Sequence, residues 1–160
     1  MTSRRVLFIG GTGIISTSSG RRALEQGWDL TLLNRGSSTT RPVPDGAEVV
    51  VADIRDPACV KAALGDREFD AVVDFVAFTP EHVKADVEVF TGRTGQYVFI
   101  SSASAYQTPP ARLPILESSP LRNPAWEYSQ NKIAAEQVLV DAYRSTGFPA
   151  TIVRPSHTYD

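Results

Sequence analysis

The chain has 160 residues, a length typical of one folded domain. Apolar residues make up 42% of the sequence and charged residues 21%, which excludes disordered, collagen-like and coiled-coil chains. The formal net charge of -2 favours neither nucleic acid nor a membrane surface as a partner. The single cysteine, Cys59, cannot form an intramolecular disulfide, and no Cys/His group has metal-ligand spacing, so we expect a cytoplasmic protein without a metal site.

Six short apolar segments follow one another along the chain, and each has the length and composition of a β-strand. They span residues 5–10, 29–34, 47–52, 71–76, 96–101 and 150–154. Their apolar residues are continuous rather than alternating, which is typical of parallel strands that helices cover on both faces.

Segments of helical composition separate most of these strands. The expected helices span residues 14–27, 57–64, 80–90 and 126–146. This alternation predicts right-handed βαβ units, so the expected fold class is α/β, with a Rossmann-like doubly wound parallel sheet in three layers, αβα. Cys59 falls in the second helix, where we expect it to be packed.

Two connections depart from the pattern. Residues 35–46 hold glycine, proline and several Ser/Thr residues, so we expect a loop there. Residues 107–124 contain five prolines and are long for a connection inside a compact domain, which indicates a loop on the substrate side. A proline-rich linker between domains is the alternative.

A glycine-rich turn connects the first strand to the first helix. Its residues are Gly10, Gly11, Thr12, Gly13, Ile14 and Ile15. Glycines in this position let backbone N–H groups approach a pyrophosphate that a Cβ would obstruct, and the helix N-terminus adds partial positive charge. We therefore expect a dinucleotide site, although Ser16 stands where a third glycine would let helix and strand pack closely. A plain tight turn is the alternative.

The ends of the second and third strands are candidates for the adenosine side of that site. Asn34 and Arg35 stand where cofactor-binding folds usually place an acidic residue for the ribose hydroxyls. The Arg35 guanidinium could pair with a 2′-phosphate, so NADP is favoured over NAD; a solvated loop arginine is the alternative. Asp53 and Ile54 could cap the adenine, and Asp53 could equally be a helix-capping or turn residue.

Tyr128 and Lys132 lie four residues apart at the start of the last expected helix, so both project from one face. An ammonium group beside a phenol stabilises the phenolate, which suits the tyrosine for general acid/base chemistry. A solvent-facing pair on an amphipathic helix is the alternative. Serines at positions 101, 102 and 104 follow the fifth strand, at the sheet edge where doubly wound folds bind ligands. One hydroxyl could bind a substrate oxygen, but spacing does not decide which, and turn chemistry is the alternative.

Together these motifs resemble the NAD-dependent epimerase/dehydratase family of extended short-chain dehydrogenases/reductases. The resemblance rests on residues 10–15, 53–54, 70–77, 99–106, 128–132 with Glu136, and 153–155. It implies a nicotinamide-dependent epimerase, dehydratase or reductase that moves a hydride at a hydroxyl or carbonyl carbon of a nucleotide-sugar-like substrate. Its catalytic residues would be Ser102, Tyr128 and Lys132. The tyrosine and lysine would also contact the cofactor, which Val76 and Ala77 would line.

The resemblance also implies a domain organisation. Members of this family continue after the last strand into a smaller domain that holds the sugar nucleotide. We therefore expect residues 1–160 to be the NAD(P)-binding domain, with the C-terminal substrate domain absent from this chain. Relatives often form homodimers through the helices expected here at 80–90 and 126–146.

Three positions depart from the family pattern, namely Ile9, Ser16 and the pair Asn34-Arg35. Such atypical members include proteins that bind ligands or RNA without doing chemistry. A non-catalytic, dinucleotide-responsive regulator is therefore the alternative function, and an RNA-associated protein is a second alternative that the acidic net charge disfavours.

Overall fold

A computed structural model describes residues 3–36 and 41–159. Residues 37–40, in the middle of the loop expected at 35–46, lie outside the described residues. Six strands form one parallel sheet in the order β3-β2-β1-β4-β5-β6. The strands are β1 (Arg5–Ile9), β2 (Asp29–Asn34), β3 (Glu48–Val51), β4 (Ala71–Asp74), β5 (Tyr97–Ile100) and β6 (Ala150–Val153). This order is that of a doubly wound Rossmann-like sheet, so the expected fold class is confirmed.

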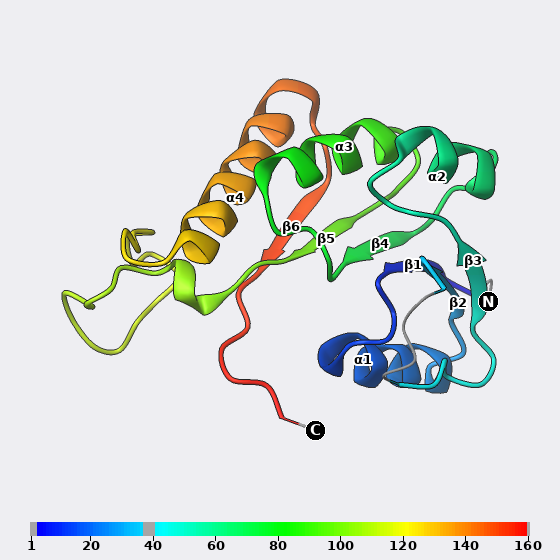
Figure 1. The fold of residues 1–160 in the computed structure, drawn as a ribbon, viewed down its shortest axis with the longest axis horizontal. Coiled ribbons are helices and arrows are strands. Elements are labelled where there is room, and N and C mark those ends of the chain that lie inside the picture. Colours follow the sequence, from blue (N-terminus) through cyan, green and yellow to red (C-terminus); the bar gives the residue numbers. More distant parts are fainter. Residues whose placement is uncertain (1–2, 37–40, 160) are drawn as a thin grey trace.

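Helices lie on both faces of this sheet. They are α1 (Ile14–Glu25), α2 (Pro57–Leu64), α3 (Pro80–Phe90), α4 (Glu127–Thr146) and a short 3-10 helix, η1 (Ala103–Ala105). Helix α1 lies on one face, and α2, α3 and α4 lie on the other (Figure 1). In the described part of the chain, no helix has the length and apolar character needed to cross a membrane.

Local capping explains where the helices begin and end. The Asp56 side chain accepts hydrogen bonds from the first-turn amides of α2, and Thr79 does the same for α3. Each is followed by a proline at the first helical position, which lacks the N–H that would be unpaired there. Gly27 and Gly147, both with positive φ, follow α1 and α4. The sequence predicts that the first helix ends at residue 27, but α1 ends at Glu25, because Gly27 has a φ of 73, which is not helical.

The main hydrophobic core lies between the sheet and the three helices α2, α3 and α4. It includes Val72, Phe90, Phe99 and Leu139, all fully buried. A smaller cluster of Val6, Phe8, Leu30 and Leu32 packs toward α1, whose Leu24 contacts it. Both clusters pack against the strands whose carboxyl ends carry the candidate site.

The expectation that helices cover both faces of every strand is wrong for the outer strands. Strands β1 and β2 are buried almost throughout, but Val51 of β3 is 64% exposed and Val153 of β6 is 40% exposed. Strands β3 and β6 are the sheet edges, and α1 contacts β2 rather than the outer strands. Cys59 is also exposed, because α2 buries the face that holds Val60 and Leu64 instead.

The proline-rich segment at residues 107–124 forms a loop that extends away from the sheet (Figure 1). Its base is closed by backbone hydrogen bonds from Gln107 to Pro120 and from Thr108 to Arg122. The chain then continues into α4 and β6 of the same sheet. The segment is therefore a loop within one α/β unit, as expected, and the alternative of an interdomain linker is wrong.

Candidate dinucleotide-binding and catalytic site

The glycines of the turn after β1 have two different roles. A Cβ on Gly10, which has a φ of 81, would clash with Val76, and one on Gly11 would lie 2.6 Å from Leu32 Cδ2. These two glycines therefore allow close packing. Gly13 is exposed, and a Cβ there would meet only Ser16 Oγ, at 3.4 Å. The backbone at Gly13 is the part of the turn that a ligand can approach.

Ser16 closes this turn. Its buried hydroxyl accepts the N–H of Gly13 at 2.8 Å, while the Gly13 carbonyl accepts the N–H of Thr17 as α1 begins. The Gly13 amide is therefore used within the turn. The amides of Ile14 and Ile15 lie in the first turn of α1, where a helix offers them no carbonyl partner. These amides, and the partial positive charge of the helix end, remain for an anion.

A groove of about 770 Å³ runs along the carboxyl ends of the central strands, where the strand order reverses between β1 and β4. Expected site residues on its wall are Gly10, Thr12, Gly13, Ile14, Ile15, Asn34, Arg35, Asp53, Ile54 and Val76. Among the further lining residues, which the sequence did not assign to the site, are Arg41, Arg55, Phe78, His82 and Ile100.

Side-chain contacts shape one end of the groove. Asn34 Oδ1 accepts the N–H of Gly36 at 2.9 Å, so Asn34 forms the turn that presents the exposed Arg35. Asp53 Oδ1 accepts the N–H of Arg55 at 2.9 Å, which confirms its turn role. Its helix-capping alternative is wrong, because Asp56 caps α2.

The segment after β4 lies between the groove and Lys132. Val76 lines the groove, whereas Ala77 is fully buried and contributes its carbonyl instead. Lys132 Nζ donates to the carbonyls of Ala77 and Ile100, both at 2.7 Å. Lys132 thus connects the ends of β4 and β5.

Lys132 is 1% exposed, so the solvent-facing alternative is wrong for it. Its Nζ lies 4.6 Å from the ring centroid of Phe99, 5.0 Å from that of Phe78 and 5.7 Å from that of Tyr128. Burial lowers the pKa of Lys132 to about 8, and the negative charges of Asp74 and Glu136 oppose this effect. A cation held among aromatic rings is stabilised electrostatically by the ring faces.

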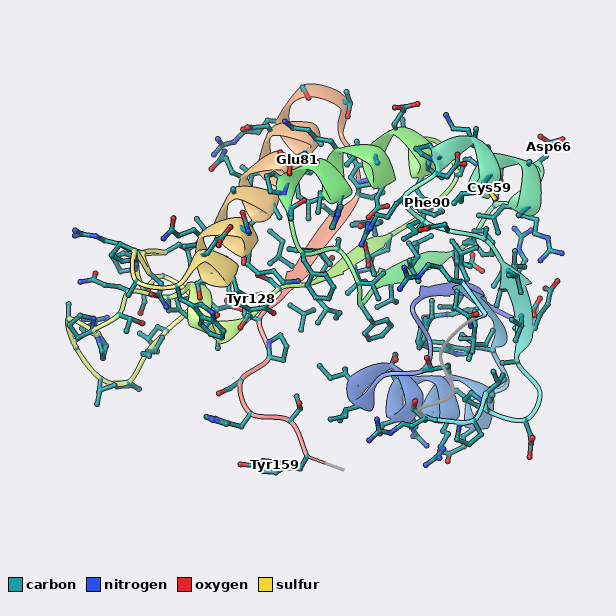
Figure 2. The ribbon with its side chains drawn as sticks, in the orientation of Figure 1. Cys59, Asp66, Glu81, Phe90, Tyr128 and Tyr159 are labelled. Carbon is teal, nitrogen blue, oxygen red and sulfur yellow. The ribbon has the colours of Figure 1, made fainter. Side chains whose placement is uncertain are left out.

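Tyr128 is half-buried in the first turn of α4, and Figure 2 shows it at the N-terminal end of that helix. Its ring centroid lies 5.0 Å from that of Trp126 and 6.5 Å from that of Phe78. Phe78 lines the groove, whereas the predicted catalytic residues Ser102, Tyr128 and Lys132 are not among its lining residues, so the tyrosine adjoins the groove through Phe78. Phe78 and Trp126 are 45% and 53% exposed, so the surroundings of Tyr128 offer open aromatic surface.

A chain of hydroxyl groups connects Ser102 to α4. Ser102 Oγ lies 2.9 Å from Ser104 Oγ, which accepts from Ser129 Oγ at 2.8 Å. The Asn123 Nδ2 group donates to the Ser104 carbonyl at 3.0 Å and lies 3.4 Å from Ser129 Oγ. Ser129 is fully buried and directly follows Tyr128 in the sequence. The chain thereby fixes Ser102 relative to the tyrosine-bearing helix.

The Asn123 side-chain NH₂ group, at one end of this chain, sets the direction of the hydrogen bonds next to it. An amide NH₂ can only donate, so Asn123 donates to Ser129, and Ser129 donates to Ser104. The Ser104 hydroxyl keeps its own proton and can donate it to Ser102. Ser102 Oγ also accepts the backbone N–H of Ser104, at 3.1 Å. When Ser104 is the donor to Ser102, the hydroxyl proton of Ser102 is available to another acceptor, such as the oxygen of a bound alcohol or carbonyl.

A buried ion pair supports this region from behind. Arg154, after β6, donates to both carboxylate oxygens of Glu136 on α4, at 2.9 and 2.7 Å. Ser101, after β5, donates to the same carboxylate, and Arg154 also donates to the Tyr106 hydroxyl at 3.1 Å. The hydrogen bonds to Glu136 raise the pKa of Arg154. The pair ties together the ends of β5 and β6 and the middle of α4.

The family model of the NAD dependent epimerase/dehydratase family matches residues 6–159, almost the whole chain. The chain belongs to this family. The resemblance expected from the glycine turn and the Tyr128–Lys132 pair is therefore confirmed.

One relative in this family is a UDP-glucose 4-epimerase from Lactobacillus helveticus. It is 30% identical over 167 residues, and the match covers 94% of this chain and 50% of that protein. The crystal structure of UDP-glucose 4-epimerase from Brucella ovis in complex with NAD shares the fold, with a TM-score of 0.81 at 24% identity, over 95% of this chain and 51% of that one. The chloroplast stem-loop binding protein of 41 kDa b from Arabidopsis thaliana is 26% identical over 170 residues, 99% of this chain and 43% of that protein. The chain spans about half the length of these curated relatives.

The groove of this family member fits a dinucleotide. The backbone at Gly13 is exposed, the amides of Ile14 and Ile15 have no carbonyl partner within the helix, and Val76 lines the same groove. Sequence reasoning missed Phe78, Asn123 and Ser129. Phe78 directly follows the Val76-Ala77 pair, and the other two flank Tyr128, but no spacing rule singles them out.

Proposed function

We propose that this chain binds NADP, and NAD with lower affinity, along the groove and provides the acid/base groups of an epimerase or dehydratase. The observation that supports this most strongly is spatial. An exposed backbone at Gly13 opens onto one groove, and Phe78 on the wall of that groove packs against Tyr128 and Lys132. The name of the 30% identical relative, UDP-glucose 4-epimerase, supports a nucleotide sugar as the substrate.

In this proposal the chain holds the cofactor with residues from four elements. The amides of Ile14 and Ile15 bind the diphosphate, Asp53 and Ile54 contact the adenine, and Val76 contacts the nicotinamide side. When bound, the nicotinamide ring accepts or donates the hydride at the substrate carbon.

The protons are handled by the chain itself. Tyr128 takes the proton of the substrate hydroxyl, or returns it to a carbonyl oxygen, and the charge of Lys132 stabilises the phenolate. Ser102 donates its remaining proton to the same substrate oxygen. Burial lowers the pKa of Lys132 to about 8, so the residue is mainly charged at neutral pH, as this role requires.

The preference for NADP rests on Arg35. It is exposed on the groove wall, and two further arginines, Arg41 and Arg55, line the same groove. A guanidinium pairs with a phosphate through two hydrogen bonds, whereas the ribose hydroxyls of NAD would need an acceptor there. Asn34 is a poor acceptor for these hydroxyls, because its Oδ1 already accepts the Gly36 N–H.

Calorimetric titration with NADP and NAD tests the binding part of the proposal. We expect NADP to bind more tightly, and Arg35→Ala to remove the difference by weakening NADP alone. The catalytic part is tested on the full-length protein by following the conversion of nucleotide sugars, because an epimerase or dehydratase returns the hydride and accumulates no reduced nicotinamide. Tyr128→Phe is expected to lose most turnover and to keep cofactor affinity, while Tyr143→Phe, exposed on the same helix, keeps both. Unchanged turnover in Tyr128→Phe would contradict the catalytic assignment.

The proposal also includes a separate substrate domain and a homodimer. The substrate domain is assigned to sequence beyond residues 1–160, because the relatives are about twice as long as the matched region. A homodimer through α3 and α4 would place two copies of these helices in one bundle. Analytical ultracentrifugation tests this expectation, and a monomer at all concentrations would contradict it.

RNA binding is a second candidate function, favoured by one observation, the name of the chloroplast stem-loop binding relative. The net charge of -2 gives the whole chain no attraction for phosphates. Gel-shift titrations of an RNA stem-loop in a salt series decide the point. Binding that saturates at physiological salt would support this candidate.

A further inference from the structure

Three buried titratable side chains lie directly behind the groove, and the chemistry proposed above does not use them. Asp74 ends β4, Asp86 lies on α3 and Tyr97 begins β5, and each is 0% exposed. Tyr97 Oη lies 3.0 Å from Asp74 Oδ2 and 2.8 Å from Asp86 Oδ2. The phenol therefore bridges two carboxyl groups away from water.

The number of protons in this cluster follows from its geometry. A phenol has one proton, so Tyr97 can donate to only one of the two carboxyl groups. The second contact is a hydrogen bond only if the other carboxyl group is protonated and donates to the phenolic oxygen. Two ionised carboxylates this close in a buried site would also repel each other. The cluster therefore holds one carboxylate and one carboxylic acid.

The surroundings decide which carboxyl group is ionised. Asp74 Oδ1 accepts the backbone N–H groups of Val76 at 2.7 Å and Ala77 at 2.9 Å, and such donors stabilise a carboxylate. Asp86 Oδ1 is buried and has no hydrogen-bond partner among the described residues, which suits a neutral acid. Burial and the nearby Asp74 raise the pKa of Asp86 well above its ordinary value. The hydrogen bonds therefore run from Asp86 to Tyr97 to Asp74.

Asp74 is connected to the proposed catalytic lysine in two ways. Its amide contacts fix the Val76-Ala77 segment, and the Ala77 carbonyl is an acceptor for Lys132 Nζ. Its negative charge also raises the pKa of Lys132 against the effect of burial. Glu136, the other carboxylate that acts on the lysine, already shares its charge with Arg154.

Other charged groups around the cluster do not reverse this assignment. Arg55, before α2, lowers the pKa of Asp86, but this effect is smaller than those of burial and Asp74. His82, in the first turn of α3, has its own pKa lowered by burial and by Arg55. Lys132, on α4, interacts with Asp74.

We propose that Asp74 is a positioning residue of this site: as the ionised end of the Asp86–Tyr97–Asp74 chain, it holds the Val76-Ala77 segment and stabilises the charge of Lys132. Asp86 keeps the proton of the pair. The positioning role rests on the proposed function of Lys132, but the proton order depends on neither cofactor nor substrate.

Carbon-13 NMR of the ligand-free chain, labelled at the aspartate carboxyl and lysine ε carbons, tests both parts. The sequence has only three lysines, at positions 61, 84 and 132. We expect one aspartate to stay protonated far above the ordinary range and to lose its signal in Asp86→Asn. We also expect Asp74→Asn to lower the titration midpoint of Lys132 from about 8, and Asp86→Asn to leave it unchanged.

Stability gives an independent measurement. Because the pKa of Asp86 is raised in the folded chain, that chain binds one more proton than the unfolded chain at pH values between the ordinary and the raised pKa of Asp86. The folding constant of the wild type should therefore fall by up to about tenfold per pH unit in that window, relative to Asp86→Asn. Glu88→Gln, an exposed carboxyl on the same helix, is the matched control and should keep the wild-type pH dependence.

The proposal is overturned if the high-titrating carboxyl persists in Asp86→Asn, or if Asp86→Asn lowers the Lys132 midpoint as Asp74→Asn does. Should Asp74→Asn fail to fold, the wild type and Asp86→Asn still decide the proton order, and a Lys132 midpoint lowered in Asp86→Asn still overturns the positioning role. All these measurements use the ligand-free chain. Their failure is therefore distinct from a failure to bind cofactor, which would refute the proposed function instead.

Discussion

Replacing Gly13 by alanine should separate cofactor binding from folding. Gly13 has an extended backbone with φ of -90, and the added Cβ would meet only Ser16 Oγ at 3.4 Å. Alanine is a poorer N-cap than glycine by about 1 kcal/mol, and it restricts the unfolded chain by a compensating ~0.4–1 kcal/mol. The free energy of unfolding should therefore change by less than about 1 kcal/mol.

The effect on binding should be larger. A methyl group over the exposed turn would keep a diphosphate from the first-turn amides and remove one or two charge-assisted hydrogen bonds, at about 1.5–3 kcal/mol each. Each ~1.4 kcal/mol is a tenfold change in the dissociation constant, so NADP affinity should fall at least about tenfold. Calorimetry measures the affinity and urea unfolding measures the stability.

Two other glycines provide matched controls. Gly20→Ala lies inside α1, where its Cβ would make ordinary contact with Leu30 at 3.4 Å, so it should fold well and bind NADP normally. Gly11→Ala would press against buried Leu32 and should lose about 1–3 kcal/mol of stability. Wild-type affinity in Gly13→Ala would refute the placement of the diphosphate at this turn.

Two further predictions concern the supporting contacts. Arg154→Met leaves the buried Glu136 carboxylate without its ion-pair partner and should lower the free energy of unfolding in urea by about 3–5 kcal/mol. The double variant with Glu136→Gln should recover most of this loss. Equal losses in the single and double variants would contradict the pairing argument. Ser129→Ala interrupts the hydroxyl chain to Ser102 and should lower turnover about tenfold at unchanged cofactor affinity. Ser145→Ala, exposed on the same helix, is its control, and similar turnover in both variants would show that the chain does not orient Ser102.

Much of the fold could be predicted because its signals are local. Pro57 and Pro80 mark the starts of α2 and α3, and the continuous apolar runs mark every strand to within two residues at each end. The glycine turn and the four-residue spacing of Tyr128 and Lys132 likewise depend only on neighbours in the sequence. These features need no knowledge of packing.

The contacts between elements could not be predicted in this way. Asp74, Asp86 and Tyr97 come from β4, α3 and β5, and their meeting depends on how α3 packs on the sheet. The same holds for Asn123 and the hydroxyl chain. Helical spacing predicts that Lys132 shares a face with Tyr128, but only the packing of α4 against the ends of β4 and β5 buries it.

The central claim is that a dinucleotide with its diphosphate at Gly13 lies along the groove and reaches the phenol of Tyr128 beside Phe78. A crystal structure of this chain with NADP tests it most directly. The account predicts the diphosphate on the amides of Ile14 and Ile15, the 2′-phosphate against Arg35, and the nicotinamide ring beside Phe78 and Tyr128. A nucleotide bound elsewhere, or an unfilled groove at saturating NADP, would contradict it.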